Sequence, residues 1–166
     1  MSVRALCAVL LVLAAGCGGT ETVTTTVTVG ATAKDGAPRD LVVFGYIDSL
    51  AREGAGYELR FDPAQFLSGE TANVAAAEDG KVEPGEPVPN DNYVVDEGKR
   101  LFTFLVPADA EVTVLTKSPE GTPVSVAELA EIVAGEHAPL WEPIATGFWI
   151  RYRIDTVSSI EQQYRP

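Results

Sequence analysis

The pattern of hydrophobic and polar positions places a folded domain at residues 41–166. Residues 41–50 are rich in β-branched and aromatic side chains, and the apolar residues Tyr57, Leu59 and Phe61 then alternate with charged ones. An alternation with a period of two is typical of a strand with one buried face, and glycines between the two runs favour a tight turn. The domain is therefore predicted to begin with a β-hairpin.

Later runs in the chain also have the composition of strands. Four of them are β-branched or alternating: residues 92–95, 101–106, 111–116 and 148–155. In the last of these runs, one face is expected to carry Phe148, Ile150, Tyr152 and Ile154. A turn near residues 155–156 should then lead into a final strand at residues 157–164.

A first helical segment is predicted between residues 62 and 80. Asp62 suits a helix N-cap, Pro63 the first helical position and Gln65 the third. Gly69 should end or break this helix, and an alanine-rich stretch then runs to a second stop at Gly80. We expect two short helices or one kinked helix.

A second helix is predicted over residues 126–134. Ser125 and Glu128 form a capping box, apolar residues follow at helical spacing, and Gly135 comes directly after them. Many short strands with two helical insertions indicate a mainly β domain with minor α content. The predicted α+β fold is a small antiparallel barrel or strongly curved sheet with two or three short helices.

The first residues of the chain have the pattern of a signal peptide. Arg4 precedes an apolar run from Ala5 to Ala15. This run is about half of the roughly 20 residues that cross a bilayer, and it matches the core of a secretory signal.

Residues 13–17, LAAGC, resemble the lipobox of bacterial lipoproteins, although Ala14 stands where that family usually has leucine. The resemblance implies a signal peptide at residues 1–16, a lipid on Cys17 and anchorage at the outer face of the cytoplasmic membrane. The segment that follows Cys17, to residue 40, is rich in Thr, Gly and Ala, which indicates a flexible tether; its alternating Thr and Val residues leave an edge strand as the alternative. The alternative is an ordinary secretory signal that leaves Cys17 as a free thiol.

The domain also resembles an uncharacterised secreted domain found in lipoproteins of high-GC Gram-positive bacteria. Three stretches carry this resemblance: residues 61–80, 89–95 and 160–166. It implies no catalytic or ligand-binding residues.

Charge and composition limit the function classes that fit. The chain has 24 acidic and 12 basic residues and a net charge of −12, so it lacks the basic footprint of a nucleic-acid-binding protein. His137 is the one histidine in the sequence, and no G-x-S-x-G motif is present. We therefore expect no nucleophilic catalytic set, no zinc site and no cofactor.

The segment from residue 70 to residue 97 is strongly acidic. Against one base, Lys81, it carries eight acidic residues: Glu70, Glu78, Asp79, Glu83, Glu86, Asp91, Asp96 and Glu97. A solvated acidic loop is the favoured interpretation. A glycosidase-like carboxylate pair in this segment is an alternative.

A calcium site is a second alternative for the same segment. Its oxygen ligands would come from residues 90–92 together with the candidate metal ligands Asp91, Asp96 and Glu97. Asn90, Asp91, Asn92 and Tyr93 are also candidate contacts for a ligand or partner. However, Asn and Asp side chains favour turns, so we prefer the interpretation that they shape the entry into the strand at Tyr93.

Trp149 shares one face of its strand with Arg151 and Arg153, opposite the face that carries Phe148 and Ile150. If this face is exposed, Trp149, Arg151 and Arg153 form a candidate contact for a partner or glycan. If the helix at residues 126–134 covers it, Trp149 belongs to the core, and we favour burial.

The sequence thus predicts a lipid-anchored, non-enzymatic module of the cell envelope that binds a protein, glycan or small ligand. The alternatives are an envelope hydrolase that uses carboxylates of residues 70–97 and a calcium-stabilised structural module. No nucleic-acid partner is expected.

Overall fold

The computed structural model describes residues 39–98, 100–136 and 140–165. The strands are β1 (Leu41–Glu53), β2 (Gly56–Ser68), β3 (Asn92–Val95), β4 (Phe102–Val106), β5 (Glu111–Val114), β6 (Thr122–Val124), β7 (Phe148–Arg153) and β8 (Thr156–Gln162). The helices are α1 (Gly69–Glu78) and α2 (Val126–Val133), with short 3-10 turns η1 (Pro89–Asp91) and η2 (Ile144–Thr146).

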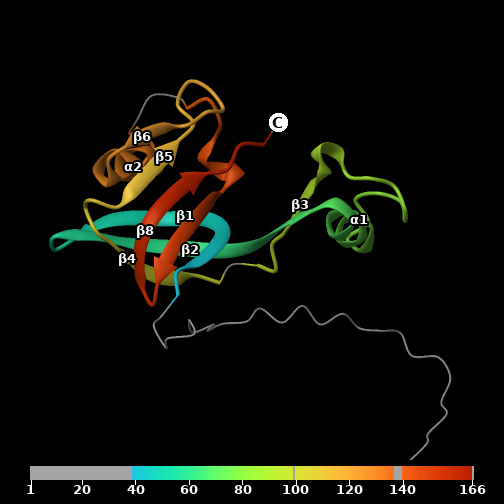
Figure 1. Cartoon of the computed structure of the whole chain (residues 1–166), viewed down its shortest axis with the longest axis horizontal. Coiled ribbons are helices and arrows are strands. Elements are labelled where there is room, and N and C mark those ends of the chain that lie inside the picture. The colour runs from blue at the N-terminus through green and yellow to red at the C-terminus, as the bar shows by residue number, and fades with distance from the viewer. Residues whose placement is uncertain (1–38, 99, 137–139, 166) are drawn as a thin grey trace, which may run out of the picture.

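Five strands close into a barrel in the order β1-β2-β4-β8-β7 (Figure 1). The fourth of these along the chain, β7, returns to lie beside the first, β1, which is the Greek-key arrangement. All neighbours in the barrel are antiparallel except β4 and β8, which meet in parallel at Leu105 and Thr156. β5 and β6 extend the sheet beyond β8. The predicted fold class, a small mainly β barrel with short helices, is confirmed.

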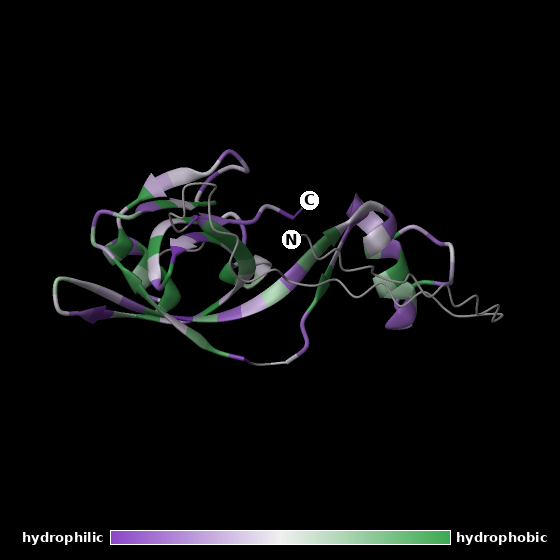
Figure 2. Ribbon diagram, turned by 60° about the horizontal axis from the view of Figure 1, so that its bottom comes forward, coloured by the Kyte–Doolittle hydropathy of each residue, from purple (hydrophilic) through white to green (hydrophobic). Residues whose placement is uncertain are grey.

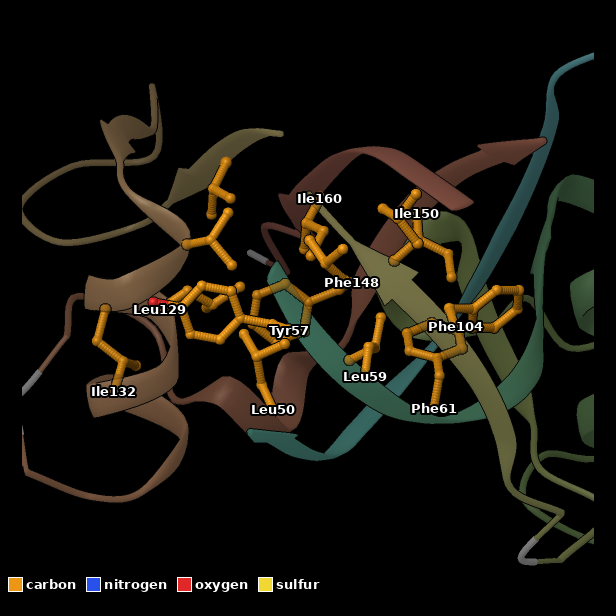
Figure 3. Close-up of a cluster of buried hydrophobic side chains, with 14 of the residues drawn as sticks. Leu50, Tyr57, Leu59, Phe61, Phe104, Leu129, Ile132, Phe148, Ile150 and Ile160 are labelled. Carbon is orange, nitrogen blue, oxygen red and sulfur yellow. The ribbon is translucent and has the colours of Figure 1, made fainter. Parts of the chain in front are cut away.

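The interior of the barrel is filled with apolar side chains. Fully buried members of this core are Leu59, Phe61, Phe148, Ile150, Val157 and Ile160. In Figure 3, Leu129 and Ile132 of α2 lie at one end of the cluster, and Phe61 and Phe104 lie at the other. Helix α2 therefore closes one end of the barrel with its apolar stripe.

β2 is longer than the barrel requires and continues out of it. It pairs with β1 as far as Ala64 and then with β3 over Gln65–Ser68. Helix α1 packs on this two-stranded ribbon and forms a second, smaller core around Ala72, Ala76 and Val88. Figures 1 and 2 show this unit projecting to one side of the barrel.

The predicted helix start at Asp62 is wrong. Residues 62–68 belong to β2, and α1 begins at Gly69, where we expected a helix to end. Asp62 accepts a hydrogen bond from the backbone N–H of Arg100 (2.8 Å) instead of capping a helix. Pairing of β2 with strands on both sides outweighs the local capping signal, because propensity is a weak prior against tertiary contacts.

The predicted helix stop at Gly80 is confirmed. Gly80 has a φ of +65° and donates its N–H to the carbonyl of Ala77 (3.0 Å). The next N–H, that of Lys81, bonds to the carbonyl of Ala76 (2.8 Å). This pair of bonds is a Schellman motif, which favours glycine at the left-handed position.

The second helix is confirmed in type and position. The N–H of Glu128 donates to Oγ of Ser125 (3.2 Å), and the N–H of Ser125 donates to the Glu128 carboxylate (2.7 Å). Both halves of the predicted capping box are therefore present. Gly135 follows the helix with a φ of +77°.

Ile154 does not share the buried face of β7, so that part of the prediction is wrong. Phe148 and Ile150 are buried, but β7 ends at Arg153, and Ile154 lies in the turn with a φ of +60°. Its side chain is 75% exposed. The alternation fails because the two-residue turn begins at Ile154, one residue earlier than predicted, and leaves the strand geometry there.

Candidate functional site

A group of aromatic side chains lies on the outer face of the barrel. Phe148 and Ile150 point into the core, so Trp149 between them points outward. Phe44 is opposite Trp149 on β1 and therefore shares its face. Phe66 follows two residues after Ala64, the residue of β2 that is opposite Phe44. With Tyr46 of β1, these residues form what we term the outer aromatic cluster: Phe44, Tyr46, Phe66 and Trp149.

The rings of the cluster pack directly on one another. Phe44 is the centre: its ring centroid lies 5.8 Å from that of Tyr46, 5.1 Å from that of Phe66 and 5.2 Å from that of Trp149. Phe66 and Trp149 are 5.6 Å apart. These edge-on and tilted pairs fall within the range that favours aromatic contact, about 4.5–7 Å. Phe44 is only 2% exposed although it lies outside the barrel core, and the other three rings are half-buried.

The segment after β8 covers this cluster. We term residues 163–165 the strap. The N–H of Gln163 donates to the carbonyl of Gly147 (2.9 Å), and Nε1 of Trp149 donates to Oε1 of Gln163 (2.6 Å). The guanidinium of Arg165 then lies over the rings of Phe44 and Phe66, 5.8 and 5.9 Å from their centroids. The chain beyond β8 runs toward the side where β3 and α1 project (Figure 1).

Arg165 is held with part of its hydrogen-bonding capacity unused. Its Nε and Nη2 atoms are buried, and neither has a hydrogen-bond partner among the residues that the structure describes. Each buried donor left unpaired costs at least about 1–3 kcal/mol. The two cation–π contacts lie within the limit of about 6 Å, and such contacts contribute about 0.5–1 kcal/mol at exposed sites and about 2 kcal/mol when desolvated. The rings therefore offset part of the cost of burying this guanidinium.

The predicted aromatic–arginine contact has a different composition in the structure. Trp149 is half-buried, and the strap covers it, whereas α2 packs on the barrel core. Arg151 is exposed farther along β7, and Arg153 forms an exposed ion pair with Asp40 (2.8 Å). The arginine that does contact the aromatic group is Arg165.

The residues before β3 have the geometry of a turn. Asn90 and Asp91 have positive φ values, 59° and 55°, and Nδ2 of Asn92 donates to the carbonyl of Asn90 (2.8 Å). This geometry fits the interpretation that they shape the entry into the strand. The hydroxyl of Tyr93 donates to Oδ2 of Asp79 (2.8 Å), and this hydrogen bond raises the pKa of Tyr93 above its ordinary value.

The candidate metal ligands are not brought together. Asp91 and Asp96 lie at opposite ends of the four-residue strand β3, five positions apart, which corresponds to about 16 Å of extended chain. Asp96 accepts the N–H of Gly98 (3.0 Å), and Glu97 accepts Nε2 of Gln65 (3.4 Å). The described part of the chain contains no group of three or more His, Cys, Asp or Glu side chains able to hold a metal ion.

The acidic residues of the 70–97 segment are all exposed on and around the projecting unit. Cys17 and His137, by contrast, lie outside the described residues. Within residues 39–165 as far as the structure describes them, no helix has both the length and the apolar character needed to cross a membrane.

The members of the site that were missed from the sequence include Phe44, Phe66, Gln163 and Arg165. The helix expected at residues 62–69 concealed Phe66, and no local pattern brings Arg165 to β1. The sequence did contain a signal for Phe44. In the alternating pattern of residues 41–50, Val43 and Ile47 are on the face that packs against the barrel core, and Phe44 is on the opposite face.

Comparison with known proteins returned no match: neither a family model, nor a curated protein, nor a solved structure matches this chain.

Proposed function

We propose that this chain is a lipid-anchored protein of the bacterial cell envelope, and that its domain is a non-enzymatic module that binds another envelope protein. In this proposal the chain is exported and held at the outer face of the cytoplasmic membrane through Cys17. The lipobox-like residues 13–17 and the following Thr-rich segment support the anchor.

The filled barrel is the observation that carries the choice of a protein partner. The side chains that point inward pack into one continuous cluster closed by α2. Small ligands are usually bound in concave sites such as the mouth of an open barrel. A barrel whose interior is occupied by its own core favours contact through its outer surface.

The outer aromatic cluster and its arginine supply the residue types for such a contact. Aromatic side chains and arginine are enriched at the centres of protein interfaces, where they provide large contact areas. Here they gather on one side of the barrel, and Tyr164 of the strap is 36% exposed beside them.

The anchor is tested by Cys17→Ser in the full chain, followed by cell fractionation. We expect the protein to leave the membrane fraction or to accumulate uncleaved. Cys7→Ser is the matched control, because Cys7 lies within the predicted signal peptide. Unchanged processing and membrane retention of the Cys17→Ser chain contradict the proposed lipid anchor.

The binding role is tested by photo-crosslinking in intact cells. A crosslinking amino acid at Tyr164 should give a discrete protein adduct, and the same amino acid at Lys117, in the exposed loop after β5, should not. Trp149→Ala should remove the adduct at Tyr164. Equal adducts at both positions, or none at Tyr164, contradict a binding surface at the outer aromatic cluster.

A further inference from the structure

We propose that the outer aromatic cluster is the docking surface for an arginine-bearing segment of a partner protein, and that the strap occupies this surface when the partner is absent. This inference rests on the proposed binding function, because it specifies the chemistry of the partner.

The contacts of the strap define the chemistry that the surface accepts. Nε1 of Trp149 donates a hydrogen bond to a side-chain amide oxygen, which Gln163 supplies. The rings of Phe44 and Phe66 form cation–π contacts with a guanidinium, which Arg165 supplies. The two groups are two residues apart in the chain, so a competing segment needs a Gln or Asn followed by an arginine at the same spacing.

The strap itself is an imperfect occupant of this surface. Within the described part of the chain, its guanidinium leaves the Nε and Nη2 donors buried and unpaired. An arginine that arrives from solvent on another chain is not tied to the end of β8, so it is free to orient these donors toward water or a carboxylate. Glu161 is available for this role, because it is exposed and lies opposite Trp149 on β8.

Charge also favours a basic partner. The chain has a net charge of −12, which attracts a cationic segment and accelerates its association. The strap can be displaced without opening the barrel, because it lies beyond β8 and is held by hydrogen bonds to Gly147, just before β7, and to Trp149. Segments at the ends of elements open at a fraction of the free energy of global unfolding.

The test measures the affinity of the full chain for a free copy of the strap. The probe is the blocked peptide acetyl-Gln-Gln-Tyr-Arg-amide, which has the sequence of residues 162–165. All proteins carry Trp141→Phe, so that Trp149 is the one remaining tryptophan and its fluorescence reports binding. Gln163→Ala removes the acceptor for Trp149 and loosens the strap, and it should tighten peptide binding about tenfold.

Three comparisons make the result specific. Gln65→Ala, at an exposed glutamine on β2, is the matched control and should bind the peptide as weakly as the chain with an intact strap. A peptide carrying Arg165→Gln should lose binding, and Phe66→Leu in the protein should weaken it. Circular dichroism checks that each variant is folded, and Gln163→Leu, which also removes the acceptor but keeps the side-chain volume, replaces Gln163→Ala if the latter is not.

The proposal is overturned if strap variants and the intact chain bind the peptide equally, or if Arg165→Gln in the peptide changes nothing. A concentration-dependent dimer of the intact chain by light scattering also overturns it, because the occupant would then be the strap of a second copy. The assay uses purified protein, so its failure leaves the crosslinking and fractionation results unaffected.

Discussion

Gly147 is the position at which the packing of the outer aromatic cluster is most directly tested. Its φ of 92° and ψ of 173° lie in a region that is essentially restricted to glycine. A Cβ added there would lie 2.8 Å from Cε2 of Phe44 and 3.0 Å from the carbonyl oxygen of Gly45. Gly147→Ala therefore introduces both backbone strain and a steric conflict with the central ring.

The expected cost of Gly147→Ala follows from these two effects. Backbone strain of this kind costs about 1–3 kcal/mol, and overpacking costs about 1–3 kcal/mol more. We therefore expect the free energy of unfolding to fall by about 2–6 kcal/mol. Gly54→Ala is the control: Gly54 has a φ of 55° but no atom within 4 Å of an added Cβ, so it should cost about 1–2 kcal/mol.

Equilibrium unfolding in guanidinium chloride, followed by circular dichroism, measures both losses. A double-mutant cycle separates the effects at Gly147, because in a Phe44→Ala background the conflict with the ring disappears, whereas the backbone strain of about 1–3 kcal/mol and the close approach to the carbonyl of Gly45 remain. The reasoning is refuted if Gly147→Ala costs no more than Gly54→Ala, or if Phe44→Ala leaves its cost unchanged.

Three further outcomes are expected. The raised pKa of Tyr93 should appear as an ultraviolet titration midpoint above about 10, and Asp79→Asn should lower this midpoint. The stability that this hydrogen bond contributes is complete below pH 10 and is lost as the pH rises through the pKa of Tyr93 in the folded state. The side chain of Gln162 is 4% exposed and forms hydrogen bonds with backbone groups after β5 and before η2. Gln162→Leu leaves these buried backbone groups without a partner, so it should lower the free energy of unfolding by about 2–4 kcal/mol, and a loss near zero contradicts this expectation. Ser125→Ala should cost about 1 kcal/mol in the same unfolding assay, and more than Ser68→Ala, because Ser68 caps α1 without a side-chain bond.

The elements predicted well are those whose local and tertiary signals agree. The hairpin alternation at Tyr57, Leu59 and Phe61 places all three in the barrel core. The capping box at Ser125 is local chemistry that forms wherever the following apolar stripe can be buried, and α2 buries it on the barrel. Such elements need no knowledge of distant partners.

The elements that were missed depend on partners far away in the sequence. The end of β2 is a strand because β3 pairs with Gln65–Ser68, and no sequence pattern near Asp62 predicts that pairing. The short strand β6, Thr122–Val124, contains a proline and was not predicted, since only its pairing with β5 makes it a strand. Likewise, the outward direction of Trp149 could be predicted from alternation, but its cover by Arg165 could not.

The continuous path of β2 from the barrel into the projecting ribbon has a consequence for how the chain reaches its fold. β2 and β4 meet first at Phe61 and Phe102, so pairing these barrel strands directly requires closing a loop of about 40 residues, 62–101. Once β3 has paired with β2, Val95 is fixed opposite Gln65, and about six residues remain to be closed before Phe102 meets Phe61. Because closure entropy grows with the logarithm of loop length, early folding of the α1–β3 unit lowers the barrier to barrel closure by about 1.5 kcal/mol. The projecting unit therefore lowers the entropic cost of adding β4, the third strand of the barrel along the chain, in addition to any contribution it makes to the surface of the folded protein.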